Sequence, residues 1–243
     1  MTGQKELSDN LNNWNYINRY SEWMFHTYEE FIGKRVFDVG AGMGRMAKFY
    51  VKNCEKAVAT DIFLNQVQYM NERFKNISGF EAIKMNILEE EIPQKYHESF
   101  DTVLCINVLE HLENDMLAIT KMKELLEVGG HMVIMVPAWQ KLYCSLDINV
   151  NHYRRYDPGM LINLAKKNEL KIIKNIYFNR LGIIPYWIKG KKKANTDESF
   201  STSLNESNSR IYNFASVILE PIERKWPPRK GLSELIILEK GEH

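Results

Sequence analysis

The chain has 243 residues but only three cysteines, Cys54, Cys105 and Cys144, and no two of them form a CxxC pair. An odd number of cysteines without metal-ligand spacing argues against a disulfide framework and a zinc site, so we expect reduced thiols and no metal ion. Long apolar runs are also missing, since none approaches the roughly 18 residues that a helix needs to cross a bilayer. The polar N-terminus has no signal-peptide core. These absences predict a cytoplasmic protein without a transmembrane segment.

Excess charge of either sign is absent as well. The chain carries 32 basic and 31 acidic residues, and its longest basic run is the short stretch at 189–193. Such a balance gives no field that would attract a polyanion, so a nucleic-acid partner is not expected. The hydrophobic content of 44% is ordinary for a globular protein and is enough for one sizeable core.

Short apolar runs alternate with helical patterns from residue 35 onward. The runs are 35–39, 57–60, 80–85, 100–106, 131–136 and 170–178, and the helical patterns are 45–53, 64–76, 112–126 and 158–168. This alternation predicts an α/β fold in which a mostly parallel sheet has helices on both faces. Ligands of such folds bind beyond the carboxyl ends of the strands.

The segments outside this alternation suggest a division of the chain. Residues 14–33 have aromatic and apolar side chains at helical spacing, whereas 195–209 is polar and serine-rich, as a mobile loop would be. Apolar stretches on both sides of that loop are typical of a lid over a binding site. The lysines beside Trp187 would in addition allow weak peripheral contact with an anionic membrane. The predicted parts are an N-terminal helical cap (1–34), an α/β core (35–178), a helical lid insertion (179–230) with a flexible loop (191–209), and a terminal strand of the core (231–243).

Three glycines at alternate positions follow the first apolar run, in the sequence DVGAGMG at 38–44. Glycine at such a point lets the backbone turn tightly and lets a ligand approach it closely. The dinucleotide fingerprint GxGxxG would place its last glycine at position 45, where this chain has Arg45, so the spacing disfavours NAD. Asp61 ends the second run, where a carboxylate can accept hydrogen bonds from both hydroxyls of a ribose. Together these residues predict nucleoside binding.

With these motifs the chain resembles the class I S-adenosylmethionine-dependent methyltransferases. The similar stretches are DVGAGMG, ATDIF, FDTVLCINVLEHLEND, LLEVGGHMVIMVP and the terminal GLSELIILEK. The segment LYCSLDINVNHYRRYD resembles a bacterial subgroup that methylates small molecules. The resemblance implies a Rossmann-like, doubly wound sheet of seven strands with an antiparallel last strand, and S-adenosylmethionine as the cofactor.

The resemblance also implies which residues bind this cofactor. They are Asp38, Gly40, Ala41, Gly42 and Gly44 in the first motif, Asp61, Ile62 and Phe63 after the second strand, and Asn86, Ile87 and Asn107 after the third and fourth. Asn86 stands where the family usually has an aspartate, and its side-chain carbonyl still accepts a bond from the adenine amino group, without charge. Tyr16 and Tyr20 are candidates to close over the sulfonium group, with core packing as the alternative.

Methyl transfer is an in-line displacement that depends mainly on alignment, and a hydroxyl acceptor also needs a base. Histidine suits that role at neutral pH, and His152 follows the fifth strand, near the expected mouth of the site. A hydrogen-bonded loop histidine is the alternative, and His111 is better placed for a structural or cofactor-side role. The candidate acceptor-binding residues are Trp139, Tyr153, Arg154 and Arg155, although the two arginines would equally pair with acids at the surface.

Four other functions compete with this prediction. Amino-methylating nucleic-acid enzymes carry N/D-P-P-Y/F after the fourth strand, whereas this chain has NVLE at 107–110. A dehydrogenase is disfavoured by the glycine spacing, and a protein methyltransferase or a non-catalytic module that binds the cofactor stays open. We therefore predict a methyltransferase that acts on an oxygen or nitrogen of a small molecule, such as a biosynthetic intermediate or a lipid-like compound. Acceptor identity and oligomeric state stay open.

Overall fold

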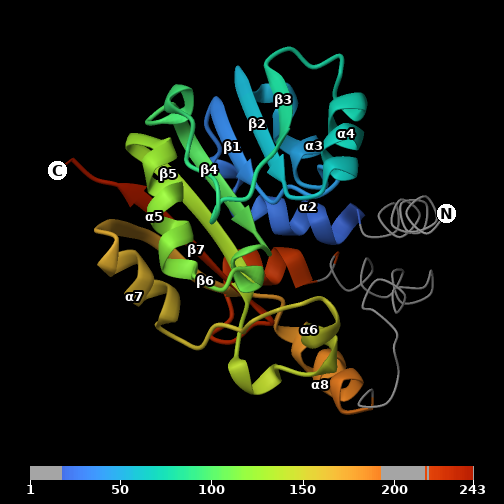
Figure 1. Ribbon diagram of the computed structural model, residues 1–243. Coiled ribbons are helices and arrows are strands. Elements are labelled where there is room, and N and C mark those ends of the chain that lie inside the picture. Colours follow the sequence, from blue (N-terminus) through green and yellow to red (C-terminus); the bar gives the residue numbers. More distant parts are fainter. Residues whose placement is uncertain (1–17, 193–216, 218, 243) are drawn as a thin grey trace.

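The computed structural model describes residues 18–192, 217 and 219–242, and these residues form one seven-stranded sheet of order β3-β2-β1-β4-β5-β7-β6 (Figure 1). All pairs are parallel except those of β7, which runs antiparallel to β5 and β6. The predicted fold class is confirmed, and each predicted apolar run coincides with a strand or overlaps one. The strands are β1 Arg35–Val39, β2 Lys56–Asp61, β3 Phe80–Lys84, β4 Phe100–Ile106, β5 Leu126–Pro137, β6 Leu170–Phe178 and β7 Ser233–Lys240.

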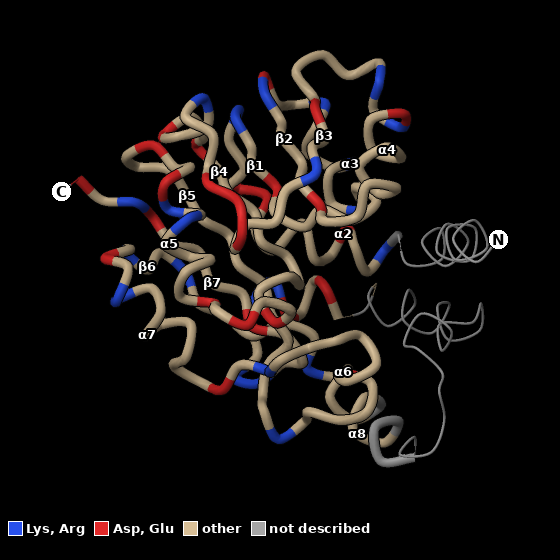
Figure 2. Tube along the Cα trace, viewed as in Figure 1, with Lys and Arg blue, Asp and Glu red and all other residues tan. Residues whose placement is uncertain are grey.

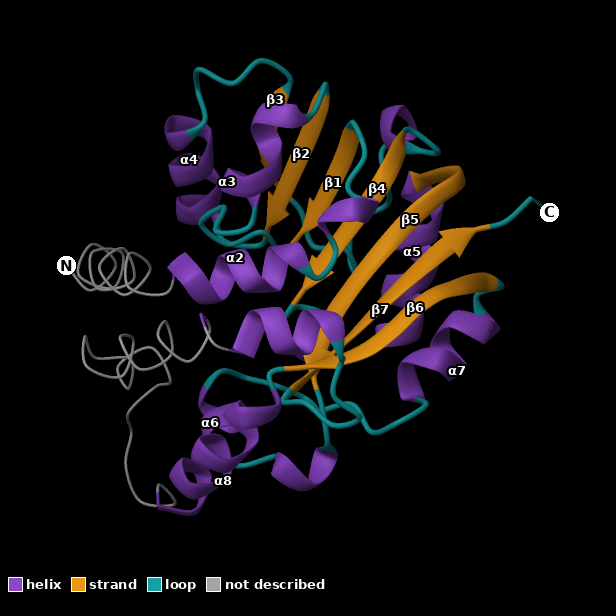
Figure 3. Cartoon of the chain, turned by 180° about the vertical axis from the view of Figure 1, so that it is seen from behind, coloured by secondary structure: helices purple, strands orange, loops and turns teal. Residues whose placement is uncertain are grey.

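Helices cover both faces of the sheet, as Figures 1 and 3 show from opposite sides. The helices are α2 Asn18–His26, α3 Ala47–Tyr50, α4 Leu64–Arg73, α5 Asp115–Leu125, α6 Ser145–Asn149, α7 Met160–Lys167 and α8 Ile183–Lys192. Residues 219–225 are also helical. α5 and α7 pack on one face, and α2, α3 and α4 pack on the other. α6 and α8 lie together beyond the carboxyl end of β5.

The two faces form two separate cores because successive residues of a strand point to opposite sides. In β1, Phe37 packs into the core under α5 and α7, whereas its neighbour Val36 packs into the core under α2, α3 and α4. Both side chains are fully buried. A parallel sheet covered on both faces needs such continuous apolar runs, which explains why these strands show little alternation with polar residues.

The N-terminal helix α2 packs on the sheet through large apolar side chains. Trp23 and Met24 are buried, and the Trp23 ring lies 4.5 Å from that of Phe178 at the end of β6. The Arg19 guanidinium pairs with Glu220 at 2.7 Å, which joins α2 to the helical residues 219–225. Tyr16 and the predicted loop between residues 193 and 209 lie outside the described residues. The division into cap, core, lid and terminal strand stays a prediction.

Charged residues of both signs are distributed along the whole described trace (Figure 2). This mixing agrees with the near-zero formal net charge of +1. Within the same part of the chain, every helix is too short or too polar to cross a membrane.

Glu234 in β7 is a buried acid whose titration should lower the stability of the fold at neutral pH. Its side chain is fully buried, and the Asn175 side chain is the neighbour that interacts with its carboxylate. Burial raises the pKa of Glu234 from 4.5 to about 7. The folded state therefore holds this proton at pH values where the unfolded chain has lost it, so stability falls as the pH rises from about 4.5 to about 7.

We expect Glu234→Gln to remove most of this pH dependence and to stabilise the protein at pH 8 by an amount on the order of 1 to 3 kcal/mol. Glutamine keeps the shape of the protonated acid and carries no charge. Urea unfolding of both proteins at about pH 5 and about pH 8 measures the effect. An unchanged difference between the two pH values would show that the Glu234 carboxylate is not the group that titrates.

Candidate cofactor and acceptor site

The glycine motif forms a tight loop at the carboxyl end of β1. Gly40, Gly42 and Gly44 have φ angles of 65°, 61° and 70°, in the left-handed region that side chains disfavour. The backbone N–H of Gly42 donates to Asp61 Oδ2 at 2.9 Å, and that of Phe63 donates to Asp61 Oδ1 at 3.0 Å. Asp61 therefore ties the glycine loop to the turn after β2. Burial raises the pKa of its carboxyl group.

Two of the glycines also allow close packing. A Cβ at Gly40 would lie 2.6 Å from Val108 Cγ2, and one at Gly44 would lie 2.7 Å from Phe74 Cε2. The acid that opens the motif, Asp38, points away from the loop and accepts a hydrogen bond from the Tyr50 hydroxyl at 2.7 Å. Burial raises its pKa to about 7. Asp38 thus anchors α3 to the sheet beneath the loop.

A cavity of about 670 Å³ opens at the carboxyl ends of β1, β2 and β4. Predicted residues that line it are Gly40, Gly42, Asp61, Ile62, Phe63, Asn86, Ile87, Asn107 and Tyr153. The lining combines bare backbone, the carboxylates of Asp61, Glu89 and Glu113, and apolar side chains such as the half-exposed Ile62 and Phe63, which suits a phosphate-free nucleoside with an aliphatic tail. Asn86 Oδ1 already accepts from the Leu88 N–H at 3.1 Å, so one of its two lone pairs remains for a ligand. Asp38, Ala41 and Gly44 do not line this cavity.

A second cavity of about 330 Å³ adjoins the first, and its surface is mostly apolar. Asn107, His111 and Val150 line both cavities and form the wall between them. Asn107 takes a positive φ of 55°, and its N–H donates to Met135 O at 2.8 Å. The other lining residues are Tyr20, Met24, Arg45, Glu110, Pro137, Leu146, His152, Arg155, Asn179, Tyr186, Leu232 and Ser233.

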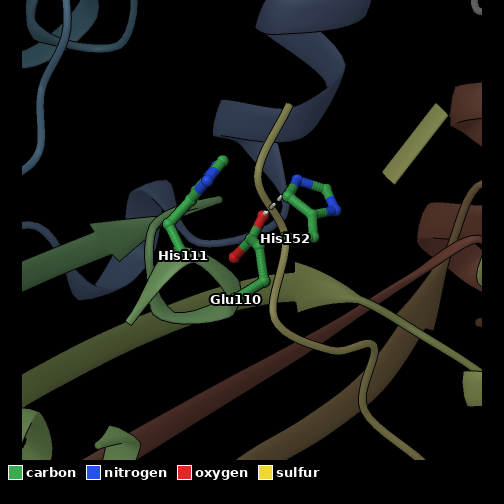
Figure 4. A group of neighbouring side chains, drawn as sticks. All are labelled: Glu110, His111 and His152. Carbon is green, nitrogen blue, oxygen red and sulfur yellow. Dashed lines mark ion pairs between the residues drawn. The ribbon is translucent and has the colours of Figure 1, made fainter. Parts of the chain in front are cut away.

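A series of buried, interacting charged side chains runs along one side of the second cavity. Arg155 Nε lies 2.8 Å from Asp147 Oδ1, and the same oxygen lies 2.9 Å from His152 Nδ1. His152 Nε2 in turn faces Glu110 Oε1 at 3.8 Å, as Figure 4 shows. Burial raises the pKa of Glu110 to about 8, and burial together with the nearby His152 lowers the pKa of His111 to about 4. These linked side chains place histidine nitrogens at the wall of the second cavity.

Of the other predicted acceptor residues, Arg155 lines the second cavity, whereas Trp139 and Arg154 do not. Trp139 Nε1 donates to Gly231 O at 2.9 Å, and its ring stacks on Tyr177. Arg154 binds Asp115 Oδ2 at 2.9 Å, in line with the alternative that the sequence left open for it. Arg155 also pairs with an acid, but this pair is buried, at 2% exposure of the Arg155 side chain, whereas the sequence suggested the surface.

Sequence reasoning missed two acids of the site, Glu110 and Asp147. Glu110 directly precedes His111 in a 3₁₀ turn after β4, and Asp147 lies five residues before His152. An acidic residue close in sequence to a histidine of a predicted loop could have indicated both acids as members of the site. The contact between the two loops was not predictable, since it depends on how 138–159 folds back over β4.

Comparison with known protein families matches residues 37–134 to a methyltransferase domain. This span runs from the glycine motif to β5 and contains the loops that build the first cavity. Residues 37–134 thus form a methyltransferase domain of the class I S-adenosylmethionine-dependent type. S-adenosylmethionine is therefore the cofactor.

This methyltransferase is similar to a fatty-acid O-methyltransferase of Mycolicibacterium smegmatis, with 25% identity over 62% of the chain and 58% of that protein. It is also similar to a ubiquinone biosynthesis O-methyltransferase of Vibrio atlanticus, with 27% identity over 49% of the chain and 46% of that protein. The chain thus spans about half the length of these curated relatives. Among solved structures, a geranyl diphosphate methyltransferase in complex with S-adenosylmethionine has the same fold, with a TM-score of 0.64 and 12% identity over 92% of this chain and 85% of that one.

Proposed function

We propose that this methyltransferase transfers a methyl group from S-adenosylmethionine to an oxygen or nitrogen of a small, largely apolar acceptor. The observation that carries the proposal is the pair of adjoining cavities with a common wall of Asn107, His111 and Val150. The polar cavity follows the glycine loop and suits the cofactor, and the apolar cavity suits the acceptor. A shared wall lets the two ligands meet.

Bound S-adenosylmethionine supplies a methyl group on a sulfonium cation, whose loss leaves a neutral thioether. The protein then has to align the acceptor and exclude water, since the leaving group needs no acid. His152 is 14% exposed at the wall of the acceptor cavity and is held by Asp147, so it is placed to orient or deprotonate an acceptor. Tyr20 and Met24 from α2 and Tyr186 from α8 close the cavity from two other elements.

The acceptor cavity favours a small molecule over the competing functions. Its mostly apolar surface and volume of about 330 Å³ suit a compact, largely hydrophobic compound. The names of the curated relatives refer to fatty acids and to ubiquinone biosynthesis, which agrees with an apolar acceptor. We propose that α2 and α8 act as the cap and lid of this cavity and select the acceptor.

Incubation of the protein with methyl-labelled S-adenosylmethionine and a fractionated cell extract tests this function. We expect the label in a small molecule that partitions into organic solvent, because the acceptor cavity is apolar. Label in RNA or in protein would instead assign the activity to a macromolecular substrate. Cofactor binding without label in any fraction would favour a regulatory module.

A further inference from the structure

Two histidines and one glutamate converge at the wall between the two cavities. Glu110 and His111 end the 3₁₀ turn Leu109–His111, and His152 approaches from the loop after α6 (Figure 4). One ligand atom from each residue lies within 4.8 Å of the others. The two imidazole rings are 4.6 Å apart and nearly perpendicular. The three side chains come from two segments that are distant in sequence, so the fold assembles this cluster.

The Glu110 carboxylate has unused binding capacity inside the protein. The residue is 1% exposed, and Oε2 has no hydrogen-bond partner in the described part of the chain. Oε1 lies 3.8 Å from His152 Nε2, which is too long for a hydrogen bond. Burying a carboxylate oxygen without a partner is costly, so such an atom points to a ligand or a proton.

The orientation of His152 is fixed from its other side. Asp147 Oδ1 lies 2.9 Å from His152 Nδ1, and Asp147 is itself held by Arg155 at 2.8 Å and by the Cys144 N–H at 2.9 Å. The carboxylate places the imidazole proton on Nδ1, which leaves the Nε2 lone pair directed toward Glu110. A carboxylate behind a histidine in this way is the usual support of a metal-binding imidazole.

From this geometry we propose that Glu110, His111 and His152 bind a divalent transition-metal ion such as Zn²⁺. Imidazole nitrogens favour transition metals over Mg²⁺ and Ca²⁺, and two histidines with one carboxylate leave at least one coordination position open. Bonds of about 2.0 to 2.2 Å would draw the ligand atoms to roughly 3.3 Å from one another, which small side-chain rotations achieve. The cysteine spacing that argued against zinc does not bear on this site, which contains no sulfur ligand.

The open position would face the acceptor cavity, because all three ligands line it. The inference therefore rests on the proposed function and assigns an acceptor with a hydroxyl or carboxylate oxygen that binds the ion. A coordinated hydroxyl loses its proton to water more readily, its oxygen then forms the bond to the methyl carbon, and the electrons of the broken carbon–sulfur bond stay on sulfur. In this arrangement His152 acts on the acceptor through the ion.

Metal binding by the full-length protein, without an affinity tag and after removal of metals by a chelator, tests the site. Co²⁺ serves as a visible probe and Zn²⁺ is titrated by calorimetry. We expect one ion per chain, and we expect Glu110→Gln and His152→Gln to weaken binding at least tenfold. His131→Gln is the matched control, since His131 lies in the middle of β5, next to Glu239 and outside both cavities, and should leave binding unchanged. Unchanged S-adenosylmethionine affinity shows that each variant is folded.

Equal binding of the ion by the wild type and the two cluster variants would overturn the proposal, as would binding of less than a tenth of an equivalent. These results are independent of methyl transfer. Transfer that continues at full rate in excess chelator, without bound ion, would refute the role of the ion in binding the acceptor and leave the proposed function intact. Metal bound at the cluster without transfer to any acceptor would refute the proposed function and leave the metal site intact.

Discussion

Asp61→Ala is expected to weaken the binding of S-adenosylmethionine at least tenfold. Asp61 ends β2 inside the cofactor cavity, and its two oxygens accept from the N–H groups of Gly42 and Phe63, which aims the remaining lone pairs into the cavity. A hydrogen bond to a charged group contributes about 1.5 to 3 kcal/mol, and about 1.4 kcal/mol corresponds to a factor of ten. Calorimetric titration with the cofactor and with its demethylated product measures the loss.

Two further variants separate a lost ligand contact from a disturbed loop. Asp61→Asn keeps one acceptor oxygen and the shape of the side chain, so its affinity should fall between those of the wild type and Asp61→Ala. Glu72→Ala removes an exposed carboxylate of α4 and should bind as the wild type does. Equal affinity of Asp61→Ala and the wild type would mean that the ribose does not bind at β2.

His152→Ala is expected to lower the rate of methyl transfer about a hundredfold or more, with unchanged affinity for S-adenosylmethionine. His152 lines the acceptor cavity and not the cofactor cavity, so the effect should appear in kcat and not in cofactor binding. Single-turnover kinetics with the identified acceptor, together with calorimetry for the cofactor, give the two quantities separately.

His152→Gln distinguishes a chemical role from a structural one. The glutamine amide can still donate to Asp147, so it preserves the loop, but it cannot take up a proton at neutral pH and is a poor metal ligand. We expect the glutamine variant to be as slow as the alanine variant. Recovery of the rate in His152→Gln would assign His152 to positioning of the loop. A parallel loss of cofactor affinity would indicate that the wall between the cavities had collapsed.

The sheet, and the edge of the sheet at which the first cavity opens, could be predicted from the sequence because both depend on local patterns. Apolar runs and helical spacing identified the strands, and a parallel sheet brings the glycine loop and Asp61 to one edge whatever the loops do. The antiparallel arrangement of β7 came from family resemblance and not from periodicity. Asp38 shows the limit of this reasoning, since position in a motif does not reveal that its carboxylate turns toward Tyr50.

The acceptor side was less predictable because it is built by contacts between distant loops. One buried network of side chains joins Arg155, Asp147, His152 and Glu110. The sequence indicated only His152 as chemically active, and it assigned Arg155 either to acceptor binding or to a surface ion pair. Nothing in the local pattern shows that the loop carrying Asp147 folds onto the turn after β4. Such a network is specified by three-dimensional packing, which periodicity cannot report.

The antiparallel pairing of β6 with β7 has a consequence for how the acceptor specificity of this protein can change. Phe178 at the end of β6 is the register partner of Ser233 at the start of β7, so the segment between them leaves the sheet and returns to it at a single point. Closing a longer loop is inexpensive, since each doubling of length costs only about 0.6 kcal/mol. The described residues of this segment contribute Asn179, Tyr186 and Leu232 to the acceptor cavity and none to the cofactor cavity. Insertions or exchanges there can therefore alter the substrate range in evolution or by engineering while the nucleoside-binding half of the protein keeps its strand order and its loops.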